Sequence, residues 1–322
     1  MHYRKLGRTG LNVSEIGFGA WGIGAAQWIG AEDEGSLRAL RHAREVGINF
    51  FDTALAYGSG HSERLVARAF SNDHDAIIAT KIPPKNSIWP ARRGTRLHDV
   101  FPKAYVFSCV DESLRNLRRE QLQLEQFHVW TDAWADDPEW LATVHELKHS
   151  GKVQFLGISI NDHQPSNALK ALETGLIDVV QVIFNIFDQS PADELFPFCR
   201  EHQIGVIARV PFDEGSLTGR VRPDTTFPPG DFRNEYFKGD RKKEVWQRVQ
   251  QVASDTGTLV DELPQLALRF CLSNAAVATV IPGMRTVKHV DANAAVSDAG
   301  TLALAALERM KRHRWVRNFY PE

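Results

Sequence analysis

Four residues with acidic or basic side chains stand where apolar stretches of the sequence end. Asp52, Lys81 and His128 lie at the ends of three successive apolar runs, and Tyr57 follows Asp52 in the segment FDTALAYG. Taken alone, each has an ordinary structural explanation, such as a carboxylate that caps a loop or a tyrosine that anchors its hydroxyl. If the four side chains share a cavity, they form a site that can deliver a proton from a phenol.

The chemistry of such a site depends on the pKa of the Tyr57 phenol, which is about 10 in free tyrosine. The ammonium group of Lys81 is expected to lower this pKa, and the carboxylate of Asp52 is expected to keep Lys81 charged and in place. His128 would donate a hydrogen bond to a substrate carbonyl oxygen and hold it near Tyr57. This combination suits protonation of an oxygen atom while a hydride adds to the neighbouring carbon.

The segments that position these residues alternate between strand-like and helix-like patterns. Eight apolar runs predict strands, each followed by a segment with helical periodicity: 13–19, 48–54, 75–81, 124–130, 153–160, 179–185, 205–211 and 276–283. Strict alternation implies parallel strands, and eight units in 322 residues fit a (β/α)8 TIM barrel, an α/β fold, better than an open sheet. We therefore expect a single domain over residues 1–322, with an added C-terminal helix in 302–315.

A (β/α)8 barrel brings the C-terminal ends of its strands around one cavity, where the four residues would meet. Two connections, 82–107 and 212–240, are much longer than the roughly 2 to 6 residues usual in such units. Both leave C-terminal strand ends, so we expect them to form walls of the pocket. Four tryptophans are candidates for lining it: Trp21, Trp28, Trp89 and Trp130.

The segment GFGAWG, residues 17–22, matches the G-x-G-x-x-G pattern of dinucleotide-binding loops. That pattern requires a helix directly after the glycines and an acidic residue at the end of a second strand about 20 residues later. Here no helical pattern begins before the acidic cluster 32–34, which is typical of the first turn of a helix. We interpret the glycines as part of a strand-end loop that needs small residues.

The segments around the four candidate residues resemble signature sequences of the aldo-keto reductase family. FDTALAYGSGHSE is similar to the family's motif around its catalytic Asp and Tyr, IIATK to the segment with its Lys, and LEQFHVW to the segment with its His. The resemblance runs nearly from end to end of the chain. It implies a barrel that reduces a carbonyl group, or oxidises an alcohol, with a nicotinamide cofactor across the barrel mouth and Trp21 in the pocket wall.

The resemblance also implies where the cofactor binds. The segments LGISIND and VVQVIFN resemble the family's strand ends that bind the carboxamide of the nicotinamide. The segment VIARVPFDEGSLTGR resembles the one that contacts the nicotinamide ring and the pyrophosphate, and IPGMRTVKHVDANAAV resembles the one that binds the adenosine end of the cofactor. The contacts so implied are Ser159, Asn161, Gln181, Arg209, Pro211, Gly215, Ser216, Leu217, Gly219, Gly283, Arg285, Thr286, His289 and Asn293. Because Arg285, Thr286 and His289 could hold a 2'-phosphate, NADPH is the expected cofactor, with NADH as the alternative.

The sequence departs from the family pattern at several of these positions. Ile160 stands where the family has Asn, and Asn161 is expected to substitute for it. Arg209 replaces an aromatic residue; its guanidinium can stack on a ring but brings positive charge beside a cofactor that is cationic when oxidised, which would favour reduction. At the adenosine end, Ala292 and His289 replace an acidic residue and an Arg, which weakens the expected grip there.

Composition argues against several other classes of protein. A formal net charge of -2, from 38 basic and 40 acidic residues, gives no reason to expect nucleic acid or an anionic membrane as a partner. Three widely spaced cysteines, Cys109, Cys199 and Cys271, indicate buried thiols in a reducing compartment. The sequence has no signal-peptide pattern, no metal-ligand spacing and no apolar run near the ~18 residues of a membrane span. We expect a cytoplasmic protein that acts on a small-molecule carbonyl substrate.

The same residues allow other functions. Lys81 could be the nucleophile of a Schiff-base aldolase, with Tyr57 as a proton shuttle. The chain could also be a nicotinamide-binding regulatory or sensor subunit with little turnover. A metal hydrolase fits less well, because such barrels need several converging His or carboxylate ligands and the first predicted strand has no histidine. The substrate is left open among sugars, small aldehydes, ketones and steroids.

Overall fold

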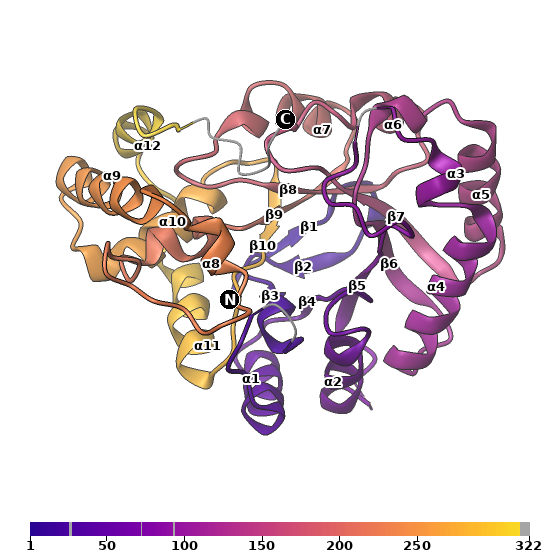
Figure 1. The fold of residues 1–322 in the computed structure, drawn as a ribbon, viewed down its shortest axis with the longest axis horizontal. Helices are drawn as coiled ribbons and strands as arrows, with labels where there is room; N and C mark the ends of the chain where they lie inside the picture. Colours follow the sequence, from indigo (N-terminus) through magenta and orange to yellow (C-terminus); the bar gives the residue numbers. More distant parts are fainter. Residues whose placement is uncertain (26–27, 72, 93, 316–322) are drawn as a thin grey trace.

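The structure is a computed structural model that describes residues 1–25, 28–71, 73–92 and 94–315. Eight parallel strands pair in chain order from β3 to β10, and helices surround them (Figure 1). The strands are β3 (Phe18–Gly19), β4 (Phe50–Asp52), β5 (Ile77–Ile82), β6 (Leu122–Phe127), β7 (Val153–Ser159), β8 (Val179–Ile183), β9 (Gly205–Arg209) and β10 (Val277–Val280). The order of strands is that expected from strict alternation of strand and helix.

The sheet closes on itself between its first and last strands. Ile16 forms a parallel bridge with Val280, and Gly19 forms one with Gly283. The N–H of Gly17 donates to the Val280 carbonyl at 2.8 Å, across the same seam. The predicted (β/α)8 barrel is therefore confirmed, and Gly283, expected at the cofactor, lies at the seam.

The glycines of GFGAWG serve this closure. A Cβ atom on Gly19 would lie 2.7 Å from the Ile281 carbonyl oxygen, and one on Gly17 would lie 2.9 Å from Oγ1 of Thr279. Side chains at these positions would push β3 away from β10. The motif thus reflects close packing of two strands, in agreement with its interpretation as a segment that needs small residues.

The predicted first strand, 13–19, is divided between two sheets. Its first residues belong to β2 (Asn12–Ser14), which forms an antiparallel hairpin with β1 (Tyr3–Lys5). Leu6 and Val13 of this N-terminal region belong to a buried apolar cluster. Phe50, Leu124 and Val179 of the barrel strands belong to the same cluster. The hairpin therefore covers the N-terminal end of the barrel, and the chemistry belongs at the opposite end.

Helices cover the outside of the barrel, and a larger apolar cluster fills the space between them and the strands. They are α1 (Asp33–Glu45), α2 (His61–Ala69), α3 (Leu97–Val100), α4 (Lys103–Leu117), α5 (Pro138–His149), α6 (Leu169–Glu173), α7 (Leu195–Glu201), α8 (Arg233–Tyr236), α9 (Arg241–Thr256), α10 (Leu263–Leu272), α11 (Val287–Ala294) and α12 (Leu304–Lys311). The predicted C-terminal helix is α12, shorter than expected, which packs against α9 (Figure 1).

The two long connections contain short helices. The first carries α3 and reaches α4 at Lys103, and the second carries a 3-10 segment, Asp213–Thr218, followed by α8. Cys109, Cys199 and Cys271 are buried free thiols. Among the described residues, no helix has the length and apolar character needed to cross a bilayer, and no three potential metal ligands gather.

Candidate active site

A buried ion pair lies at the C-terminal ends of β4 and β5. Nζ of Lys81 donates hydrogen bonds to Oδ2 of Asp52 and to the Thr53 carbonyl, both at 2.7 Å. Oδ1 of Asp52 accepts a hydrogen bond from Nε2 of Gln181 at 2.7 Å. Burial alone would lower the pKa of Lys81, but the charge of Asp52 and the Tyr57 phenol outweigh it, and the pKa is raised. The lysine is therefore held as an ammonium ion.

Tyr57 is carried by the turn that follows β4. Its N–H donates to the Ala54 carbonyl at 3.0 Å, and Nζ of Lys81 lies 5.1 Å from the centre of its ring. Burial raises the pKa of the Tyr57 phenol, and although the charge of Lys81 opposes this, the net pKa lies above its usual value. The expected net lowering is therefore wrong, because loss of hydration outweighs the nearby ammonium. The phenol is protonated at neutral pH.

His128 follows β6 and faces Tyr57. The centres of the two rings are 5.7 Å apart, and the indole of Trp89 lies edge-on to the imidazole at 4.5 Å. Burial holds the pKa of His128 well below its usual value, and the charges of Lys81 and Arg209 act in the same direction. Its buried Nδ1 has no hydrogen-bond partner in the described part of the chain. The imidazole is neutral and can donate one hydrogen bond.

The predicted tryptophans divide between the site and the core. Trp21 lies 6.4 Å from the Tyr57 ring and 5.3 Å from Trp28, measured between ring centres. Phe232, which the sequence did not single out, joins them at 5.4 Å from Trp21. Trp130 is 0% exposed, and its Nε1 donates to Asp132. The indole of Trp130 is therefore bonded within the core, and the assignment of Trp130 to the pocket stays a prediction.

Three residues of β7, β8 and the loop after β7 were expected to bind the carboxamide. Ser159 is buried at the end of β7, and Gln181 bonds to Asp52 beneath the site. Oδ1 of Asn161 accepts from the N–H groups of Ala91 and Trp130, each at 3.3 Å, and Nδ2 donates to the Ala91 carbonyl at 3.0 Å. Asn161 thus joins three loops through its amide, and its expected contact with the carboxamide stays a prediction.

Arg209, at the end of β9, is paired with an acid. Its Nη2 donates to the Ile160 carbonyl at 3.0 Å and to Oδ1 of Asp162 at 2.5 Å. The positive charge expected beside the nicotinamide is thus balanced by Asp162. This pairing weakens the expected bias against an oxidised cofactor.

The segment from Pro211 to Gly219 forms a tight turn. Backbone φ is positive at Gly215 and Gly219, and the N–H groups of Gly215 and Leu217 both donate to the Phe212 carbonyl at 3.0 Å. Ser216 is buried, and its hydroxyl donates to the side chain and carbonyl group of Asp213. Burial and the charges of Asp162 and Asp213 raise the pKa of Glu214 to about 8. Glu214 is then largely neutral near pH 7, so its repulsion of a phosphate group is small.

The opening of α11 gathers cationic side chains. Arg285 is half-buried and donates to the Ile29 carbonyl at 3.1 Å. Thr286 caps the helix, because its Oγ1 accepts from the His289 N–H at 3.3 Å. Burial lowers the pKa of His289, and the charges of Arg285, Arg220 and Lys288 lower it further. Arg220, not singled out by sequence, therefore joins the set, while Asn293 is buried on α11.

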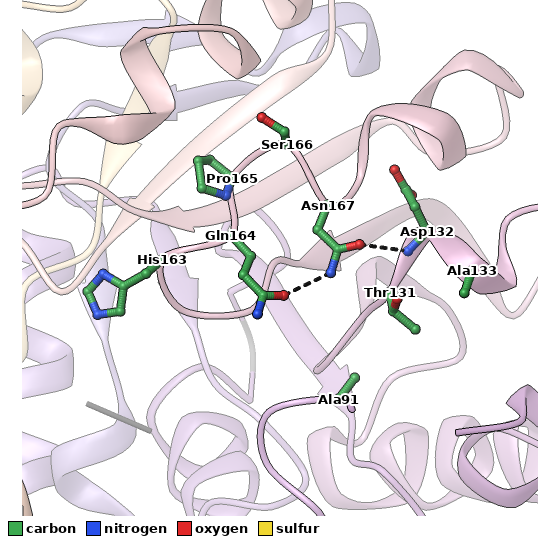
Figure 2. Close-up of a pocket in the computed structure, with 9 residues that line it drawn as sticks. All are labelled: Ala91, Thr131, Asp132, Ala133, His163, Gln164, Pro165, Ser166 and Asn167. Atoms are coloured by element: carbon green, nitrogen blue, oxygen red, sulfur yellow. Dashed lines mark hydrogen bonds between the residues drawn. The ribbon is translucent and has the colours of Figure 1, made fainter. Parts of the chain in front are cut away.

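A cavity of about 690 Å³ lies between the loops that follow β5, β6 and β7 (Figure 2). None of the four candidate catalytic residues lines it. Its lining is Ala91, Thr131, Asp132, Ala133, His163, Gln164, Pro165, Ser166 and Asn167. Most of these side chains carry hydroxyl, amide or other polar groups, and the sequence reading named none of them.

Comparison with known proteins settles the family. The model of the aldo/keto reductase family matches residues 15–314. The chain belongs to this family. As a member of the aldo/keto reductase family, it is an NAD(P)H-dependent oxidoreductase that acts on carbonyl groups.

Individual relatives are distant but cover almost the whole chain. The aldo-keto reductase YhdN of Bacillus subtilis is 27% identical over 91% of this chain and 87% of its own length. The NADH-specific methylglyoxal reductase of Escherichia coli is 27% identical over 95% of this chain and 98% of its own. The structure of aldo-keto reductase AKR11C1 from Bacillus halodurans, in its holo form, is 28% identical, with a TM-score of 0.74 and coverage of 98% and 96%.

The surroundings of Lys81 argue against the aldolase interpretation. A lysine that forms a Schiff base needs a lowered pKa so that its amine is free to attack a carbonyl group. The pKa of Lys81 is raised, and its ammonium is held by Asp52 at 2.7 Å. The side chain is arranged to remain charged rather than to act as a nucleophile.

Proposed function

We propose that this aldo/keto reductase reduces the carbonyl group of a small aldehyde or ketone with NADPH, and that Tyr57 is the general acid. The observation that carries the proposal is the buried Lys81–Asp52 pair, whose ammonium lies 5.1 Å from the centre of the Tyr57 ring. When bound, the cofactor supplies the hydride that adds to the carbonyl carbon. The protein's own residues supply the proton and hold the carbonyl oxygen in position.

Each of the four residues has a distinct role in this proposal. Tyr57 starts protonated, as its raised pKa requires, and transfers its proton to the carbonyl oxygen. Lys81 stabilises the phenolate that develops, and Asp52 keeps Lys81 ionised and fixed in position. Neutral His128 donates a hydrogen bond to the same oxygen and orients the carbonyl group. The raised pKa keeps the Tyr57 phenol protonated before the reaction, and the nearby charge of Lys81 offsets part of the cost of releasing that proton.

The residues at the barrel mouth are compatible with a bound dinucleotide. Ser159 ends β7 and pairs in register with Gln181 of β8, where the carboxamide would lie, and the turn with positive φ at Gly215 and Gly219 presents small residues to a pyrophosphate. Arg285 and Arg220 approach His289 at the opening of α11, a cationic arrangement that suits a 2'-phosphate. NADH remains an alternative, as the Escherichia coli relative is named NADH-specific.

The test is a parallel titration of the protein with NADPH and NADH, followed by protein fluorescence, and then a panel of aldehydes and ketones assayed through cofactor absorbance. We expect tighter binding of NADPH and steady turnover of at least one carbonyl compound. Tight binding with no turnover on any member of the panel would support a regulatory subunit and contradict the proposal. The three buried free cysteines fit a reducing compartment, so we propose that the enzyme is cytoplasmic.

A further inference from the structure

Arg209 is the last residue of β9, and its side chain points into the barrel. Side chains two positions apart on a strand lie on the same face of the sheet. Ile207 and Ala79 both belong to the buried apolar cluster that the barrel strands share with the N-terminal hairpin. Arg209 follows Ile207 by two positions. In the same way, Lys81 follows Ala79 on β5. The side chains of Arg209 and Lys81 are therefore directed to the same interior.

The strand register places Arg209 one layer above the buried ion pair. Gln181 of β8 bonds through its amide to Asp52, at 2.7 Å. Ile183, two positions after Gln181, is the register partner of Arg209. Arg209 therefore starts about 7 Å nearer to the barrel mouth than the level at which Asp52 is bonded. The turn that carries Tyr57 also lies beyond the end of β4, on this side of the barrel.

Two acceptors hold the guanidinium of Arg209 in place. Its Nη2 donates to the Ile160 carbonyl at 3.0 Å and to Oδ1 of Asp162 at 2.5 Å. Both acceptors come from the segment that follows β7. The side chains of Arg209 and Asp162 are 19% and 22% exposed. Because the pair is largely buried, water and salt screen its charges less than those of an exposed ion pair.

The charge of Arg209 reaches the two residues that would contact the carbonyl oxygen. Burial lowers the pKa of His128, and the positive charges of Lys81 and Arg209 lower it further. Burial raises the pKa of Tyr57, and the same two positive charges oppose this rise. Arg209 is therefore a second cation, besides Lys81, that acts on the candidate proton donor.

The negative charge of Asp162 balances this cation. Burial raises the pKa of Glu214, the charges of Asp162 and Asp213 raise it further, and the charge of Arg209 opposes the rise. Asp162 therefore acts on the turn after β9 as well as on Arg209. Loss of its charge would leave the guanidinium without this balance and increase its effect on the site.

Proton transfer from Tyr57 creates a negative charge that needs stabilisation. The phenol O–H bond breaks, a new O–H bond forms at the carbonyl oxygen, and the phenolate keeps the electron pair. Such a charge is best stabilised by positive groups that are already in place and do not move during the reaction. Lys81 is one such group, 5.1 Å from the ring centre. The anchored guanidinium of Arg209 meets the same requirement.

We propose that Arg209 is a positioning residue for the reduction: its anchored guanidinium supplies a second positive charge that stabilises the Tyr57 phenolate, and Asp162 limits this effect. The inference rests on the proposed role of Tyr57 as general acid, and it adds a residue that stands where the family pattern has an aromatic side chain. The other charged or titratable groups that face Tyr57 are Asp52, Lys81 and His128. These groups, and Glu214 beside Arg209, are the same in all variants that test the proposal.

The ionisation of residue 57 itself provides the test. The residue is replaced by 3,5-difluorotyrosine, whose phenol is more acidic than that of tyrosine and so titrates while the protein is folded. The fluorine resonance reports the ionisation of this ring alone, in the cofactor-free protein. We expect Arg209→Gln to raise the midpoint by about half a pH unit or more, because the phenolate loses a stabilising charge. Arg209→Lys, which keeps the charge, should stay close to the wild type.

Asp162→Asn leads to the opposite prediction. It keeps the shape of the side chain but removes the negative charge, so the midpoint should fall. Loss of packing alone would not move the two midpoints in opposite directions. Arg44→Gln is the matched control, since Arg44 pairs with Asp73 at 2.7 Å at the C-terminal end of α1 and is also partly buried. It should leave the midpoint unchanged.

The outcomes of the titration are decisive for each residue. An unchanged or lower midpoint in Arg209→Gln would overturn the proposal. An unchanged or higher midpoint in Asp162→Asn would overturn the part assigned to Asp162.

Kinetics separate this inference from the proposed function. With saturating NADPH and pentanal as the probe, kcat of Arg209→Gln should fall about tenfold near pH 7, and Arg209→Lys should recover most of it. If neither pentanal nor any other carbonyl compound is reduced by the wild type, the proposed function fails, but the midpoints still decide whether Arg209 acts on Tyr57. A wild-type kcat in Arg209→Gln would show that this charge takes no part in proton transfer, and would overturn the proposal.

Discussion

Nζ of Lys81 lies 2.7 Å from Oδ2 of Asp52, and neither side chain is more than 3% exposed. Two opposite charges this deeply buried are stable only as a pair, since each alone would lose its hydration without compensation. The ammonium group of this pair is a permanent positive charge beside the Tyr57 ring. The pair is therefore both a structural element at the C-terminal ends of β4 and β5 and the source of the electrostatics on which the proposed reaction depends.

Replacement of Asp52 by Asn should destabilise the protein strongly. The variant keeps the shape of the side chain but leaves the Lys81 ammonium without its counter-charge, so we expect a loss of roughly 3 to 5 kcal/mol in the free energy of unfolding. Urea denaturation at neutral pH measures this. Glu235→Gln is the control, because Glu235 pairs with Lys238 at an exposed surface site and should change stability little. A small effect of both substitutions would contradict the assignment of a desolvated pair.

Replacement of Tyr57 by Phe should remove the proton donor while keeping the aromatic ring. We expect carbonyl reduction to fall by about 10²- to 10⁴-fold, the usual contribution of a general acid, with nearly unchanged NADPH binding. Steady-state kinetics and fluorescence titration provide the two readouts. Tyr105→Phe is a matched control, since the Tyr105 hydroxyl bonds to the Pro83 carbonyl away from the site. Turnover of Tyr57→Phe at the wild-type rate would rule out the phenol as the acid.

Replacement of Arg285 by Ala should distinguish the two cofactors. If its guanidinium binds the 2'-phosphate, the dissociation constant for NADPH should rise about tenfold or more, while that for NADH changes little. The contact of Arg285 with the Ile29 carbonyl would be lost whichever cofactor binds. The informative quantity is therefore the ratio of the two dissociation constants, for NADPH and for NADH. Arg96→Ala, at an exposed site in the first long connection, serves as control. An equal loss for NADPH and NADH would show that Arg285 makes no 2'-phosphate contact.

Glu125 should make stability depend on pH. It lies on β6 with neither carboxyl oxygen bonded to another described residue, and burial together with the charge of Glu63 raises its pKa well above the usual value. The folded state therefore retains a proton that the unfolded chain loses above about pH 4.3. Between the two pKa values the folded state binds more protons, so the free energy of unfolding contributed by Glu125 falls as pH rises.

Glu125→Gln removes this dependence, because its amide has no proton to lose. Compared with the wild type, the variant should become progressively more stable as pH rises from about 5 to about 9, measured by urea denaturation. Glu120→Gln, at an exposed position between α4 and β6, should run parallel to the wild type across the same range. Parallel curves for Glu125→Gln and the wild type would mean that Glu125 does not retain its proton on folding.

The sequence predicted the barrel and its four candidate catalytic residues because both signals are local. Alternating strand and helix patterns restrict the chain to parallel strands, and parallel strands bring their C-terminal ends together, as Asp52 and Lys81 show. The side chains of Tyr57 and His128 then follow from their spacing to these strand ends. Predictions that depended on side-chain packing agree less closely with the structure. Trp130 and Asn161 lie near the expected places, but their polar groups are bonded within the structure.

What the sequence by itself determined is the order of the strands, the identity of the groups at their ends and hence the class of chemistry. The tertiary structure alone decided how those groups behave. The direction of the Tyr57 pKa shift depends on a balance between burial and the charge of Lys81, and neither the depth of burial nor the distance can be obtained from residue order. The polar cavity beside Thr131 and Gln164 likewise lies between loops that are far apart in the chain, and Asn161 bonds to Ala91 and Trp130 of two of them.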